Sequence, residues 1–198
     1  AVEQRHGRGD WFMSPDVQAD PTGASRWALS DRPAEEAVPV LLAGVSDSDA
    51  CARSIAARLI AHTESKAATR GLLHTLDATL PGARSAAALA LGLAGSEEAV
   101  DPLIAHLRDD AAGVRAVSAW GLGRLGQPKA LAPLTVALKD QVPAVRAAAA
   151  TSLGHLGDST TVEALSRALR SDPVDKVREA AAEALGHLGE KSGTPALI

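Results

Sequence analysis

The chain has 198 residues, of which 46% are hydrophobic, 22% are charged and only 2% are aromatic. This composition is typical of a globular protein, and a core so poor in aromatic rings must be built mainly from Ala, Leu and Val, which favours closely packed helices over a sandwich or a barrel. The formal net charge of −4 argues against a dedicated nucleic-acid binder, because phosphate backbones are held mainly by Lys and Arg.

Residues 1–32 differ in composition from the rest of the chain. They are rich in Gly, Pro, Asp and Ser, show no periodicity, and carry two apolar clusters, at Trp11-Phe12-Met13 and at Trp27. We expect this segment to cover the start of the following fold as an irregular cap; the alternatives are that it runs along a groove of that fold or joins it to an upstream domain. Because the chain begins with Ala1 and stops one turn into another helical pattern, we expect it to be a fragment of a longer protein.

From residue 33 onward the sequence repeats in units of 31 or 32 residues. One arginine occupies the same place in each of five units: Arg53, Arg84, Arg115, Arg146 and Arg178. The units predicted from this register are 33–63, 64–95, 96–126, 127–157 and 158–189, with the start of a sixth at 190–198. Tandem self-similarity at this period is typical of solenoids, in which each unit buries its apolar face only against its neighbours.

Each unit predicts two helices joined by a turn, because its apolar residues recur at the spacing of one helix face. One apolar column, seven residues after each repeated arginine, reads Ile60, Leu91, Leu122, Leu153 and Leu185. The second helix is predicted to end in a Leu-Gly-x-Leu-Gly motif, since a terminal glycine can adopt the left-handed conformation that stops a helix. The motif occurs at Leu122–Gly126, Leu153–Gly157 and Leu185–Gly189.

The fourth unit carries the most complete pattern, Asp140-x-x-x-x-Val145-Arg146-x-x-Ala149-Ala150-x-x-Leu153-Gly154-x-Leu156-Gly157. It resembles a HEAT repeat of the short bacterial type, which is also found in phycobilisome lyases. The third to fifth units match well, whereas the first two are degenerate, with Ala61 in place of the glycine of later units. The resemblance implies an all-α fold: a right-handed α-solenoid of tandem helix-turn-helix HEAT-like repeats whose second helices line a concave face. It implies little about function, because the family serves many roles.

Two further columns, together with the arginine column, are interpreted as structural. Four residues after each repeated arginine stands an alanine that lets neighbouring helices approach closely: Ala57, Ala88, Ala119, Ala150 and Ala182. Six residues before the arginine stands a carboxylate in four units, at Asp47, Asp109, Asp140 and Asp172, and Ala78 breaks this column. We expect the arginines and carboxylates to form a ladder of ion pairs and turn hydrogen bonds between units. The alternative is an exposed arginine strip that binds an acidic partner.

Positions five and nine residues after each repeated arginine are predicted to point away from the core and to form a binding surface, because they vary while the core columns do not. The candidate binding residues on this concave face are Arg58, His62, Leu89, Trp120, Arg124, Thr151, His155, Glu183 and His187. Trp120 and Leu89 would supply an apolar anchor, and Arg58, Arg124 and His155 polar specificity around it. On this interpretation Trp120→Ala weakens partner binding and leaves the melting temperature unchanged. The alternative is that Trp120 only covers an adjacent helix or packs against the N-terminal segment.

No catalytic, cofactor or metal site is predicted. His155 and His187 occupy equivalent positions in adjacent units, with backbones about 10 Å apart, and lack a third ligand. Cys51 is interpreted as one more small residue near a helix start. The glycines of Gly121-x-Gly123-x-x-Gly126 close a helix and do not form a dinucleotide-binding loop.

The sequence therefore predicts a non-catalytic interaction or scaffold module that binds a protein or peptide partner on its concave face. The alternatives are a bilin-handling lyase or chaperone-like protein, which the resemblance to phycobilisome lyases implies, and a regulatory or sensor module of a larger membrane or enzyme protein. We expect a soluble protein, cytoplasmic more readily than exported, without a nucleic-acid partner. Direct membrane insertion is not expected, because the longest apolar run, 86–95, is too short to span a bilayer. An open apolar face at Leu197 and Ile198 is expected to allow end-to-end self-association.

Overall fold

The computed structural model describes residues 35–192, and in this part of the chain it contains ten α-helices and no strand. The helices form five helix-turn-helix pairs. The first helices of the pairs are α3 (Val38–Val45), α5 (Lys66–Thr75), α7 (Val100–His106), α9 (Leu131–Ala137) and α11 (Val162–Ser171). The second helices are α4 (Ala50–Ala61), α6 (Pro81–Ala94), α8 (Ala112–Leu125), α10 (Pro143–Leu156) and α12 (Asp175–Ser192). The predicted cap at 1–32 and the apolar face at Leu197 and Ile198 lie outside the described residues.

A single turn of 3-10 helix leads into four of the five first helices. These turns are η2 (Glu35–Ala37), η3 (Glu97–Ala99), η4 (Pro128–Ala130) and η5 (Ser159–Thr161). Helix α5 begins differently, at an N-cap: the Ser65 hydroxyl accepts hydrogen bonds from the backbone N–H groups of Ala67 (3.1 Å) and Ala68 (3.3 Å). The side chain of Ser65 thus satisfies N–H groups that the helix itself leaves without partners.

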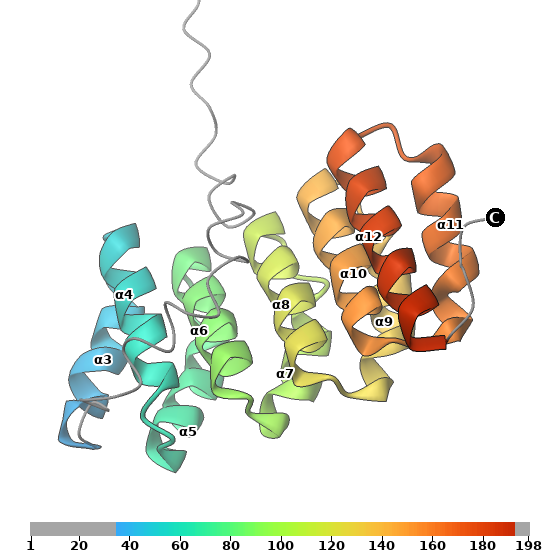
Figure 1. Cartoon of the computed structure of the whole chain (residues 1–198). Coiled ribbons are helices and arrows are strands. Elements are labelled where there is room, and N and C mark those ends of the chain that lie inside the picture. Colours follow the sequence, from blue (N-terminus) through green and yellow to red (C-terminus); the bar gives the residue numbers. More distant parts are fainter. Residues whose placement is uncertain (1–34, 193–198) are drawn as a thin grey trace, which may run out of the picture.

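The pairs stack in sequence order, with the second helices side by side in one row and the first helices in another (Figure 1). Neighbouring second helices pack closely from α4 to α12, whereas the first helices make few contacts with one another apart from α3 with α5. A stack that is tight along one row and open along the other must curve, with the tight row inside. The predicted right-handed α-solenoid is confirmed.

Leucine columns between the two rows form the core. The column seven residues after each repeated arginine, which runs from Ile60 to Leu185, is at most 1% exposed in all five units. Leu72, Leu103, Leu134 and Leu165 face it from the first helices and are equally buried. One continuous hydrophobic cluster therefore runs through all five described units.

Small residues set the close approach of the second helices. A Cβ atom built on Gly154 would lie 2.7 Å from the Cα of Ala184 in the next second helix, and one built on Gly92 would lie 2.9 Å from the Cα of Gly121. The alanines of the predicted column are fully buried in four units, at Ala57, Ala88, Ala119 and Ala150. Ala182 is only half-buried, because no described unit follows it. The column thus faces the next unit of the stack.

Glycine ends three of the second helices, and the Leu-Gly-x-Leu-Gly motif predicts two of these ends, at Gly126 and Gly157. Gly95, Gly126 and Gly157 have φ angles of +68°, +67° and +74°, in the left-handed region where a Cβ atom is unfavourable. The prediction that the fifth second helix ends at Gly189 is wrong, because α12 continues to Ser192. The three left-handed glycines lie where the chain turns at once into a 3-10 turn and a packed first helix, and no described helix follows α12.

Candidate functional site

The candidate site is the surface of the second helices that faces away from the first helices; we call it the inner face and define it by the nine predicted binding residues. Six of them are exposed: Arg58, His62, Arg124, His155, Glu183 and His187. Trp120 and Thr151 are half-buried. The structure therefore brings eight of the nine residues to an accessible surface, and their role in binding stays a prediction.

Leu89 departs from its predicted position, because it is only 5% exposed and belongs to the hydrophobic core cluster. It lies on α6, which packs between α4 and α8 and has nine buried residues among its fourteen. Trp120 packs against the same cluster. The side chain of Leu89 is therefore part of the core beneath the inner face and is not accessible to a partner. Its assignment as an exposed anchor is wrong.

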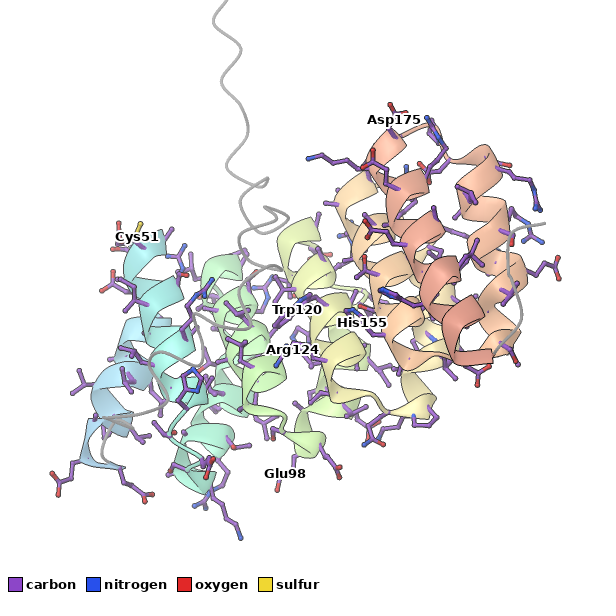
Figure 2. All side chains as sticks on the ribbon, in the orientation of Figure 1. Cys51, Glu98, Trp120, Arg124, His155 and Asp175 are labelled. Carbon is purple, nitrogen blue, oxygen red and sulfur yellow. The ribbon has the colours of Figure 1, made fainter. Side chains whose placement is uncertain are left out.

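Trp120 and Arg124 form a polar-aromatic cluster over α6. The ring of Trp120 covers Gly92, where an added Cβ atom would lie 3.1 Å from Cζ3 of the ring. The guanidinium carbon of Arg124 lies 5.3 Å from the ring centroid, and its Nε donates a hydrogen bond of 3.3 Å to the Gly92 carbonyl oxygen (Figure 2). The inner face thus carries an aromatic ring with a guanidinium over it, and Trp and Arg are both enriched at protein-binding hot spots.

Sequence reasoning missed Gly92 as the residue that makes this cluster fit. Its signal was present in the sequence, because Gly92, Gly123 and Gly154 form a column in the middle of helices, where glycine is unfavourable unless close packing requires it. The space left by the missing side chain of Gly92 is occupied both by the ring of Trp120 and by the backbone of the neighbouring helix at Gly121. The sequence-based alternative that Trp120 covers an adjacent helix therefore describes part of its surroundings.

His155 and His187 stack on each other across adjacent units. Their ring centroids are 6.2 Å apart and the ring planes differ by 18°. Among the described residues, no three His, Cys, Asp or Glu side chains lie together as a metal site requires. The stack thus brings together one inner-face side chain of α10 and one of α12.

The repeated arginines of the second to fourth units link each unit to the next. Within its own unit each Nη1 donates to the backbone carbonyl of the residue six positions earlier, as Arg115 does to Asp109 at 2.8 Å. Across the unit boundary Nε and Nη2 donate to both carboxylate oxygens of the next aspartate. The bridging pairs are Arg84–Asp109, Arg115–Asp140 and Arg146–Asp172, with Nε···Oδ2 distances of 2.7, 2.8 and 2.7 Å. These side chains are at most 15% exposed, so the paired arginines are held between the units and do not form an exposed strip.

The electrostatics of the ladder favour the ionised carboxylates. Burial raises the pKa of Asp140, but hydrogen bonds from Arg115 and from a backbone N–H outweigh this effect and hold the pKa below its ordinary value. The pKa of Asp109 is lowered by the same balance. At Asp172 the hydrogen bond from Arg146 is the largest influence and lowers the pKa.

Among the described residues, no arginine–aspartate pair of the ladder links the first unit to the second. Arg53 makes the turn contact, donating from Nη1 to the Asp47 carbonyl oxygen at 2.7 Å, but Ala78 stands where later units have the bridging aspartate. Its guanidinium lies over Gly82, where an added Cβ atom would be 2.6 Å from Cζ.

The outermost members of the two columns pair locally. The Asp47 carboxylate accepts a hydrogen bond of 2.7 Å from the Asp49 backbone N–H. In the last described unit, Arg178 pairs with Asp175 of its own helix. Within the described residues, the ion pairs of the ladder therefore link the second unit to the third, the third to the fourth and the fourth to the fifth.

A groove lies on the outer side, between α7 and α9, where the first helices are spread apart. It encloses about 570 Å³, and its lining includes Ile104, Ala132 and Val136. The cations Arg108 and Lys139 are also part of the lining. Sequence reasoning missed this groove, because it depends on the spacing of helices and not on a motif.

None of the described helices combines the length and the hydropathy needed to cross a membrane.

The family profile described as HEAT repeats matches residues 38–120 and 102–186, which together span most of the chain. The chain belongs to the HEAT-repeat family. The profile of the PBS lyase HEAT-like repeat matches residues 177–198. No curated protein matches the chain in sequence.

Solved structures similar to this HEAT-repeat protein include a chain of the complex of CpcE and CpcF of phycocyanin lyase from Nostoc sp. PCC7120. It is 28% identical, with a TM-score of 0.69, over 75% of this chain and 98% of that chain. A designed armadillo repeat protein in complex with the peptide (KR)4 is 18% identical, with a TM-score of 0.54, over 91% of this chain and 97% of that chain. An engineered protein is 21% identical, with a TM-score of 0.52, over 80% and 81%. The last two likenesses show the fold alone.

Proposed function

We propose that this HEAT-repeat protein is a non-catalytic scaffold that binds a protein or peptide segment on its inner face. The observation that carries the proposal is the Trp120–Arg124 cluster, a half-buried ring and an exposed guanidinium on the tightly packed row of second helices. A rigid row of helices presents such groups without the entropic cost of ordering a loop. The HEAT-repeat family itself suggests a protein-interaction scaffold.

The exposed charges of the inner face indicate the chemistry of the partner. Arg58 and Arg124 are exposed cations, and Glu183 is the carboxylate among the nine inner-face residues. A partner segment with an apolar side chain for Trp120 and carboxylates on either side of it complements this surface. The exposed imidazoles of His155 and His187 offer further polar and aromatic contacts.

The test combines site-specific cross-linking with charge reversal. A photo-crosslinking amino acid at Glu183 on the inner face is compared in cells with one at Val136 on the outer face, and the captured segments are mapped. We expect one partner segment to be captured from the inner face and not from the outer face.

The purified partner is then titrated against Arg58→Glu/Arg124→Glu and against the matched outer-face variant Arg108→Glu/Lys139→Glu, which makes the same change in net charge. We expect the inner-face variant to weaken binding about tenfold or more and the outer-face variant to leave it unchanged. Loss of binding in the outer-face variant alone would overturn the proposal.

A second candidate function is that of a subunit of a bilin lyase. The specific observation is the 28% identity to one chain of the phycocyanin lyase complex. The match covers 98% of the length of that chain. On this proposal the inner face would hold a second repeat subunit or a bilin. Mixing the protein with a bilin, alone and with a second HEAT-repeat subunit from the same genome, would show a shifted absorbance band; an unchanged spectrum in both mixtures would exclude it.

A further inference from the structure

Three exposed apolar side chains lie on the first unit. Val40 of α3 is 73% exposed, and Ile55 and Leu59 of α4 are 58% and 41% exposed. They are three of the five large hydrophobic side chains that stand exposed among the described residues. We call Val40, Ile55 and Leu59 the first-unit patch.

The positions of Ile55 and Leu59 are covered in every later unit. The residues equivalent to Ile55 are Ala86, Val117, Ala148 and Ala180, and those equivalent to Leu59 are Ala90, Gly121, Ser152 and Ala184; all are buried. The residue equivalent to Val40 in the second unit is Gly71, where an added Cβ atom would lie 2.4 Å from Leu42 of the preceding unit. The first-unit patch is therefore the end face of the stack, the surface that each later unit turns toward its predecessor.

The patch is too bulky to accept another repeat in the same packing. In later units the position of Leu59 holds a small residue pressed against the preceding second helix, as Gly121 is against Gly92 and Ala184 is against Gly154. A Cβ atom added on the facing Gly92 or Gly154 would come within 3 Å of these residues, and one added at Gly121 itself would already lie 3.2 Å from Leu103. The contact is therefore fitted to small side chains, and a leucine there would have to push the two helices apart. A second copy stacked at the repeat spacing would meet the same obstacle at Leu59. The cover of this face must have a different shape from a HEAT-repeat helix.

We propose that the chain's own residues 1–34 cover the first-unit patch, with Trp27 as the principal contact. This segment joins the first unit directly at Glu35, so its local concentration at the patch is high. Trp27 lies eight positions before Glu35, a span that can extend about 26 Å and exceeds the length of about 18 Å expected for the twelve residues of α4. The segment also carries the apolar side chains that such a cover needs, since Trp11, Phe12 and Trp27 are three of the four aromatic residues of the chain.

A covered end face has a physical consequence for the whole chain. An exposed apolar patch at the end of a stack is a site for association with other molecules. The cover removes this site in each molecule and adds a stabilising contact to the first unit, whose α4 packs against no preceding second helix within residues 35–192. The inference is independent of what binds on the inner face.

Cys51 makes the proposal directly testable. It is the only cysteine of the chain, it is exposed, and it lies one turn before Ile55 on α4 (Figure 2). A nitroxide spin label on Cys51 of the full chain broadens the NMR signals of nearby protons. The chain has three tryptophans, so three indole N–H signals report on it, and single Trp→Phe variants assign them.

We expect the indole signal of Trp27 to be lost with the oxidised label and to return when the label is reduced. It should also persist with the oxidised label in Ile55→Asp/Leu59→Asp, which changes two exposed side chains. The matched control places the label at the equivalent position of the fifth unit, with Lys176→Cys in a Cys51→Ser background. There the Trp27 signal should remain at full intensity.

Three results would overturn the proposal. A Trp27 signal that stays intact with the label on Cys51 would show that the patch is not covered by this segment. Broadening that persists in Ile55→Asp/Leu59→Asp would place the segment elsewhere near α4. Broadening that appears only when spin-labelled chains are mixed with isotope-labelled Cys51→Ser chains would assign the cover to a second copy.

Discussion

Gly154 and Gly186 occupy the same position in successive second helices but have different surroundings. A Cβ atom at Gly154 would lie 2.7 Å from the backbone of Ala184, whereas one at Gly186 would meet nothing within 4 Å. We expect Gly154→Ala to lower the free energy of unfolding by about 1–3 kcal/mol, because the two helices must move apart. Gly186→Ala should raise it by about 0.5–1 kcal/mol, because alanine is the better helix former. Urea denaturation of both variants measures the difference; equal effects would contradict this account of the packing.

Trp120 is both a packing residue and the centre of the proposed binding surface. Its ring covers Gly92 and packs against the core cluster, so Trp120→Ala should lower stability by about 2 kcal/mol as well as weaken partner binding. This replaces the sequence-based expectation of an unchanged melting temperature. Arg124→Gln is the separating variant, because the exposed guanidinium can be removed without uncovering Gly92. It should weaken binding with a change in melting temperature of at most a degree or two; calorimetry and titration check the two effects separately.

At the scale of the helix pair, a substitution at Ala78 can supply the ion pair that is missing between the first and second units. We call each inter-unit arginine–aspartate pair a rung of the ladder. Ala78 stands 25 residues after Arg53, the separation of the Arg84–Asp109 pair. Ala78→Asp should give Arg53 its inter-unit carboxylate and cap the turn before α6, raising the free energy of unfolding by about 1 kcal/mol. Chemical denaturation measures the gain. Ala78→Asn is the control, because it can cap the turn without supplying the charge, and a gain equal to that of Ala78→Asp would assign the effect to the turn alone.

The existing rungs make the stack sensitive to acid. Because the pKa of Asp140 is lower in the folded chain than in the unfolded chain, its contribution to stability is fully present above the ordinary aspartate pKa of about 4 and is lost as the pH falls through the folded value. The pKa values of Asp109 and Asp172 are lowered as well, so their contributions to stability are also lost as the pH falls. Urea denaturation between pH 7 and pH 3 should show this decline.

Removing a single rung isolates its share of the acid effect. Asp140→Ala should cost about 3 kcal/mol at pH 7, because it leaves the mostly buried guanidinium of Arg115 without its carboxylate. The same variant should be less sensitive to acid than the parent chain. A variant whose stability falls with pH as steeply as that of the parent chain would show that other groups cause the decline.

At the scale of the whole molecule, the sequence predicts the fold well because every unit repeats the same packing requirement. The arginine register places all five helix pairs, and the leucine columns are the residues that the structure buries. The site is less predictable, because exposure depends on what neighbouring units do. Leu89 occupies an inner-face column but is buried on a helix packed from both sides, and α12 passes through Gly189 because a glycine permits a left-handed turn without imposing one. The outer groove between α7 and α9 follows from helix spacing that no single residue encodes.

The asymmetry between the two helix rows determines how the solenoid deforms. Backbone meets backbone along the second helices, as at Gly92 and Gly121, so the length of that row is nearly incompressible. The first helices, apart from α3 and α5, make few contacts with one another, so we expect their spacing to change more easily. We therefore expect the solenoid to bend by changes in the spacing of the first helices, while the row of second helices, which carries Trp120, keeps its length. Small tilts at successive unit boundaries add along the chain, so the ends swing widely while the spacing of groups along that row stays constant.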